Sequence, residues 1–120
     1  MSEWRKWLGS YGEKLVEKRY CAAGFELVER NFRCRTGEID LIFKKGECLY
    51  FVEVRTKSSA AYGTAEESIT LRKKATIQKV SQLFLLQRNM TEMHVQYDVV
   101  TVYIDTKQKQ AWVRRYPHAF

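Results

Sequence analysis

The sequence lacks several features that would place it in common protein classes. Its 120 residues contain one proline, Pro117, and six glycines, so no Pro-rich or Gly-rich linker divides it. Its three cysteines, Cys21, Cys34 and Cys48, form no C-x-x-C pair, which argues against a cysteine-based zinc site. The N-terminal stretch has no long apolar run, so we expect neither a signal peptide nor a membrane span. These absences favour a reduced, cytoplasmic protein with a single domain over residues 1–120.

The charge balance is the first positive indication of function. The formal net charge is +7 and the isoelectric point is about 9.4. An excess of Lys and Arg favours polyanionic partners such as nucleic acid. The basic residues are spread along the chain instead of being collected on one amphipathic helix, which makes a membrane-surface helix a weaker interpretation.

Hydrophobic patterning predicts one mixed sheet flanked by helices, in the α/β class. The order is αβββαβ, with four strands or five. The expected elements are a helix over 10–23, strands over 25–33, 38–43 and 48–54, a helix over 71–88, and strands over 94–105 and 111–116.

Local signals set the expected boundaries. Ser10 and Glu13 have the spacing of a capping box, which predicts that the first helix begins at Ser10. Gly24 is expected to end that helix, and Thr70 is expected to cap the second one. Residues 57–68 are small, polar and glycine-containing, so we expect a loop there.

Four charges lie inside the most strand-like segment: Glu38, Asp40, Glu53 and Arg55. Strand alternation predicts that all four share one face of a hairpin. A two-residue turn at 45–46 would place Glu53 opposite Glu38. A register shifted by two would place Glu53 directly opposite Asp40, and both registers bring Asp40 and Glu53 together.

Two neighbouring carboxylates repel each other unless a proton or a cation lies between them. Mg²⁺ suits such a pair because it prefers oxygen ligands, and it could activate water beside a phosphoryl group. The alternative is a cross-strand Glu–Arg pair on a solvated face. Glu13 could point along the sheet, or it could only complete the capping box. Lys73, in the first turn of the second helix, could contact a phosphate, or its stem could simply lie along apolar surface.

These residues match a known pattern. Two adjacent strands that carry D…E-x-K, with a Glu on the preceding helix, characterise the PD-(D/E)XK nuclease superfamily. More narrowly, the chain resembles the YraN family of small bacterial nuclease-like proteins over nearly its whole length. The matching segments are "GSYGE" (9–13), "RNFR" (30–33), "GEIDLI" (37–42), "FVEVRTKSS" (51–59), "YGTAEESI" (62–69), Lys73 and "YDVV" (97–100).

The resemblance implies a restriction-endonuclease-like core and a divalent metal, Mg²⁺ or Mn²⁺, held by Asp40 and Glu53. The backbone carbonyl of Val54 would be a further ligand, and Glu13 would be a ligand or a supporting acid. The superfamily's lysine falls on Arg55 here. Arginine stays protonated, so Arg55 could orient water or stabilise charge but could not act as a base. Glu38 has no implied catalytic role and could support Arg55.

The resemblance therefore predicts a metal-dependent endonuclease that acts on DNA, with Lys73, Lys57 and Arg72 on the nucleic-acid backbone. Likeness to Holliday-junction resolvases makes branched DNA a candidate substrate, and the two cuts made by many superfamily members are compatible with a homodimer. Two alternatives stay open: a nucleic-acid-binding module of the same fold without turnover, and a protein-interaction adaptor.

Overall fold

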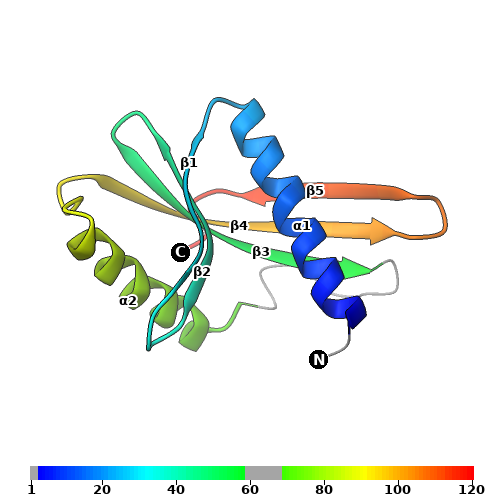
Figure 1. Cartoon of the computed structure of the whole chain (residues 1–120), viewed down its shortest axis with the longest axis horizontal. Helices are drawn as coiled ribbons and strands as arrows, with labels where there is room; N and C mark the ends of the chain where they lie inside the picture. The colour runs from blue at the N-terminus through cyan, green and yellow to red at the C-terminus, as the bar shows by residue number, and fades with distance from the viewer. Residues whose placement is uncertain (1–2, 59–68) are drawn as a thin grey trace.

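The computed structural model describes residues 3–58 and 69–120. Its elements are α1 (Glu3–Ala22), β1 (Glu26–Arg33), β2 (Glu38–Lys45), β3 (Cys48–Ser58), α2 (Leu71–Gln87), β4 (His94–Asp105) and β5 (Gln110–Tyr116). The described strands form one sheet in the order β1-β2-β3-β4-β5, in which β3 and β4 are parallel and the other neighbours are antiparallel (Figure 1). This arrangement confirms the predicted α/β class with a restriction-endonuclease-like core. Neither α1 nor α2 combines the length and the apolar character that a membrane-spanning helix requires.

Helix α1 is longer than its capping signal predicted. It runs over Glu3–Ala22, so Ser10 lies inside the helix and the expected capping box is wrong. Leu8, Val16 and Tyr20 recur at helical spacing, and all three are buried against the sheet. Gly24, with φ of +93°, lies just after the helix end, as predicted.

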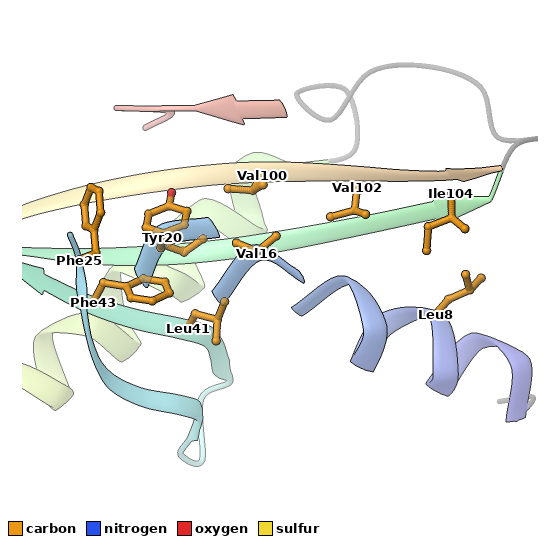
Figure 2. Close-up of a cluster of buried hydrophobic side chains, with 10 residues drawn as sticks. Leu8, Val16, Tyr20, Phe25, Leu41, Phe43, Val100, Val102 and Ile104 are labelled. Atoms are coloured by element: carbon orange, nitrogen blue, oxygen red, sulfur yellow. The ribbon is translucent and has the colours of Figure 1, made fainter. Parts of the chain in front are cut away.

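The face of the sheet beneath α1 carries the larger described core cluster (Figure 2). Figure 2 shows Val16 and Tyr20 of α1 lying against side chains of the sheet, with Leu8 near Ile104 at the far end. The Tyr20 ring stacks on Phe43, with centroids 4.5 Å apart. Burial of this apolar surface fixes α1 across β3 and β4 (Figure 1).

Helix α2 covers the opposite face, because neighbouring residues of β3 such as Phe51 and Val52 belong to different clusters. Thr70 caps α2 as predicted, since its Oγ1 accepts a hydrogen bond of 3.1 Å from the Lys73 backbone N–H. Ile77 and Phe84 of α2 are buried in the second cluster. Strand β3 continues through Ser58, so the loop predicted over 57–68 begins later than expected. Its residues 59–68 lie outside the described part of the chain.

The strand faces exchange partway along β1 and β2. Alternation would place Ile39 and Leu41 on one face, but Ile39 packs in the α2 cluster and Leu41 in the α1 cluster. In β1, Phe32 contacts the Phe84 ring of α2, with centroids 5.1 Å apart, whereas Arg30 binds Glu17 of α1. The residues at the exchange are Asn31, with φ of +48°, and Asp40. The regular alternation of side chains between the two faces is therefore interrupted at Asp40, inside β2.

Candidate functional site

The β2–β3 hairpin aligns the two predicted metal-binding carboxylates. Its turn residues are Gly46 and Glu47, because Lys45 pairs with Cys48. Gly46 has φ of +60°, which glycine adopts without strain. The pairing continues to Leu41 with Val52, and one further step of this register brings Asp40 opposite Glu53. Of the two registers that the sequence left open, the shifted one is therefore observed.

Asp40 occupies the position where the ladder between β2 and β3 ends. Its Oδ2 accepts a hydrogen bond of 2.8 Å from the backbone N–H of Val54. The Asp40 carboxylate therefore accepts a hydrogen bond that a backbone carbonyl would usually accept in a sheet, and it turns toward β3. In a strand the N–H and C=O of one residue point to the same edge, so the Val54 carbonyl is directed to the side where Asp40 lies.

The two carboxyl groups interact strongly. Burial, then the negative charge of Glu53 and a hydrogen bond with Glu53, raise the pKa of Asp40 to about 8. The side chain of Glu53 is only 5% exposed. Two carboxylates this close favour a shared proton or a bound cation, because either one removes the repulsion between them.

Two cations approach Glu53 from different elements. Lys73 Nζ of α2 lies 3.0 Å from Glu53 Oε2, and Arg55 Nη1 lies 4.0 Å from the same oxygen. The Thr70 cap fixes the first turn of α2 and so positions Lys73 over β3. Lys73 therefore forms an ion pair within the site, and its predicted contact with a phosphate stays a prediction.

Glu13 of α1 is also directed toward the acidic pair. Its Oε1 accepts a hydrogen bond of 3.0 Å from Asn31 Nδ2, so its role is not that of a helix cap. Burial raises the pKa of Glu13, and the charges of Glu38 and Glu53 raise it further, while the hydrogen bond from Asn31 lowers it. The charge of Glu13 in turn contributes to the raised pKa of Asp40. Glu13 is thus electrostatically part of the site.

Glu38 does not share a face with Asp40 by simple alternation, because the strand turns over between Ile39 and Leu41. Alternation alone therefore does not place Glu38, although Glu38 lines one hollow with Lys73, the ion-pair partner of Glu53. Its Oε2 accepts a hydrogen bond of 2.8 Å from Arg33 Nε, which gives this acid a partner other than the expected Arg55.

The predicted nucleic-acid contacts lie around the same site. Arg72 and Lys73 line a hollow of about 320 Å³, which Glu38 and Gly37 complete from the β2 side. Arg72 is exposed. Lys57 lies on β3 two residues beyond Arg55, so alternation places both on the face that bears Glu53.

Sequence reasoning assigned no role to two polar residues that the structure singles out. Asn31 takes the left-handed conformation and donates to Glu13, and an Asn between strand residues is the signal that could have revealed it. Asp98 is fully buried, and its carboxylate accepts hydrogen bonds from Tyr20 Oη at 2.6 Å, Gln96 Nε2 at 2.8 Å and Arg115 Nε at 2.9 Å. Burial and the hydrogen bond to Asp98 raise the pKa of Tyr20. An acid inside the apolar run "YDVV" was the available signal.

The donor set fits a hard divalent cation that is only partly enclosed by protein. In the described part of the chain, no three His, Cys, Asp or Glu side chains gather as a metal cage. Mg²⁺ commonly uses one or two carboxylates and completes its shell with waters and substrate phosphates. Asp40, Glu53 and the Val54 carbonyl would be that smaller set, with Glu13 in support.

Comparison with known proteins identifies the family of this chain. Residues 12–102 match the uncharacterised protein family UPF0102. A UPF0102 protein of Hahella chejuensis is 41% identical over 113 residues, covering 94% of this chain and 89% of the relative. A UPF0102 protein of Desulfitobacterium hafniense is 39% identical over 119 residues, covering 95% and 98%. One of Moorella thermoacetica is 34% identical over 120 residues and covers all of both chains. The chain therefore belongs to the UPF0102, or YraN, family, within the PD-(D/E)XK-like nuclease superfamily.

Proposed function

We propose that this protein is a metal-dependent endonuclease that hydrolyses phosphodiester bonds of DNA, with branched or structured DNA as candidate substrates. The observation that carries the proposal is the close pairing of Asp40 and Glu53, with the backbone of Val54 between them. These groups would hold Mg²⁺ or Mn²⁺. When bound, such an ion activates water and stabilises charge on the phosphoryl group.

The surrounding side chains would position substrate and charge. Lys73 and Arg55, both near Glu53, would offset the negative charge of the phosphate that is attacked. Arg55 would do so without exchanging a proton, because a guanidinium stays protonated. Glu13 would act on the pair through its charge and would hold the side chain of Asn31 in place.

DNA would be held mainly by its phosphates. Lys57, Arg72 and Lys73 lie on or beside the face that bears Glu53, and the chain carries a net charge of +7. Phosphate contacts carry no sequence information, so binding would weaken steeply with salt and depend on DNA shape. The described cysteines are all unpaired, which fits a reducing cytoplasm.

The decisive experiment is a cleavage assay on branched, duplex and single-stranded DNA with Mg²⁺, Mn²⁺ or EDTA. We expect wild-type protein to cleave at least one substrate, and Asp40→Asn and Glu53→Gln each to abolish cleavage. Glu47→Gln is the matched control, since Glu47 is an exposed acid in the turn of the same hairpin. It should cleave like wild type.

Two other results would overturn the proposal. Cleavage that survives in both site variants would identify a contaminating nuclease. Salt-sensitive DNA binding without cleavage under any metal condition would instead identify a nucleic-acid-binding module of the same fold. Sedimentation of free and DNA-bound protein would show whether two cuts are made by a homodimer.

A further inference from the structure

The sheet face that bears Glu53 continues past the acidic pair in register. Residues paired directly across neighbouring strands project to the same face. Three consecutive rows therefore share this face: Glu53–Val99–Tyr116, Arg55–Thr101–Arg114 and Lys57–Tyr103–Trp112. We call the last two of these rows the basic–aromatic rows.

The basic–aromatic rows have the composition of a nucleic-acid surface. They contain three cations, Arg55, Lys57 and Arg114, and no acid. Trp112 is 52% exposed, whereas tryptophan side chains are highly buried on average. The guanidinium of Arg114 lies over the Tyr116 ring, 5.1 Å from its centroid, which holds this cation against the sheet.

Spacing connects these rows to the acidic pair. Lys57 lies four residue steps beyond Glu53, which corresponds to about 13 Å along β3. A nucleic-acid strand with duplex rise advances by about 3.4 Å per nucleotide, so the Trp112 row lies about four nucleotides from the acidic pair. One strand could therefore contact both at once.

The side chains of the basic–aromatic rows favour unpaired nucleic acid over a duplex. Arginine and lysine bind phosphates of paired and unpaired nucleic acid alike. An indole ring can stack on the face of a base only where that base is not already stacked within a duplex, as in single strands. We propose that the basic–aromatic rows bind an unpaired DNA segment beside the cleaved phosphate, with a base stacked on Trp112 and phosphates on Lys57 and Arg114. This inference rests on the proposed nuclease function and specifies its substrate as DNA with a single-stranded region.

A second group of exposed aromatic side chains lies on α1, and it serves as a control for Trp112 and not as a competing DNA-binding site. Trp4, Trp7 and Tyr11 of α1 stack on one another, with centroids 5.3 Å apart in both pairs, so their ring faces are already largely occupied. They lie on the helix that covers the other face of the sheet. Trp7 is 51% exposed, close to the value for Trp112. Trp7→Ala therefore removes an equally exposed indole elsewhere.

The test measures DNA binding in EDTA, so that it does not depend on cleavage. Fluorescence anisotropy would compare a duplex with a single-stranded tail against a blunt duplex with the same number of phosphates. We expect wild type to prefer the tailed DNA and Trp112→Ala to lose about tenfold in affinity for it, with less than about twofold change on the blunt duplex. Trp112→Phe should recover most of the loss, and Trp7→Ala should match wild type on both.

Each contrary result overturns the inference. Equal loss on both DNAs for Trp112→Ala would make Trp112 a structural residue or a phosphate neighbour. Equal loss in Trp7→Ala would show that exposed indoles act nonspecifically, and no binding of either DNA at low salt would exclude the surface outright. A changed oligomeric state in Trp112→Ala with unchanged DNA affinity would assign the rows to a second copy of the chain. The cleavage assay tests the nuclease proposal separately.

Discussion

Lys73 of α2 and Glu53 of β3 form an ion pair in which Nζ and Oε2 lie 3.0 Å apart. A cation in the first turn of a helix opposes the helix dipole, so the helix itself gives no reason for a lysine there. The reason lies on the neighbouring strand β3, where the Glu53 carboxylate is almost fully buried and needs a positive partner. The pair therefore ties the start of α2 to the acidic site.

Lys73→Ala should impair cleavage much more than stability. Its side chain is 41% exposed, so loss of the ion pair should change the free energy of unfolding by no more than about 1 kcal/mol. Loss of a positive charge beside the attacked phosphate should slow cleavage by about tenfold or more. Lys79→Ala, an exposed position on the same helix, is the control. Single-turnover cleavage rates that are equal in wild type and Lys73→Ala would remove Lys73 from the proposed site.

Asp40→Asn should change how stability depends on pH. The ordinary pKa of this carboxyl is 3.8, and in the folded protein it is about 8. Between these values the folded protein holds a proton that the unfolded chain has released, so the free energy of unfolding falls as pH rises to about 8 and then levels. Asparagine carries no titrating proton, so the variant should lose this decline.

Urea unfolding in EDTA at pH 5, 7 and 9 would measure the effect. We expect Asp40→Asn to be more stable than wild type by about 1–3 kcal/mol at pH 9, with a much smaller difference at pH 5. Glu47→Gln should follow the wild-type curve. A stability difference that stays constant across the three pH values would contradict the raised pKa of Asp40.

Metal affinity should rise with pH for the same reason. A carboxyl group must lose its proton to bind a cation, and the pKa of Asp40 is about 8. We expect Mn²⁺ affinity to rise between pH 6.5 and 8.5, by about tenfold per pH unit where binding displaces one proton. Mn²⁺ binding should release those protons to the buffer. Calorimetry in two buffers of different ionisation enthalpy would count those protons. Affinity that does not vary over this range would exclude proton competition at Asp40.

Alanine substitution of two glycines of α1 should change the stability of the protein in opposite directions. A Cβ at Gly12 would overlap Thr56 Oγ1 and lie 3.0 Å from Thr56 Cβ, whereas a Cβ at Gly9 would meet nothing within 4 Å. Gly12→Ala should therefore push α1 from β3, lower stability by about 1–3 kcal/mol and slow cleavage by displacing the adjacent Glu13. Gly9→Ala should raise stability by about 0.5–1 kcal/mol through helix propensity. Thermal unfolding of both variants decides this, and similar shifts in the two would refute the close approach.

Local and short-range signals predicted much of this fold. The Thr70 cap, the hairpin around Gly46 and the β-branched strand β4 were readable because each depends on neighbours in sequence. The start of α1 was not, because its first turns carry the stacked rings of Trp4, Trp7 and Tyr11, and such stacking has no short-range sequence signal like that of a capping box. The exchange of faces at Asp40 was also hidden, because it requires Asn31 of another strand to take the left-handed conformation. Periodicity therefore identified the pair Asp40 and Glu53 without giving their orientation.

The buried Asp98 should support the fold and not the reaction. Its carboxylate has no exposed surface, and Tyr20, Gln96 and Arg115 hold both oxygens, so no substrate reaches it. Tyr20→Phe removes one donor from this buried charge and should cost about 1–3 kcal/mol of stability. Cleavage by the folded variant, measured well below its unfolding midpoint, should stay within about twofold of wild type. A large loss of cleavage with unchanged stability would instead place Asp98 in the active site.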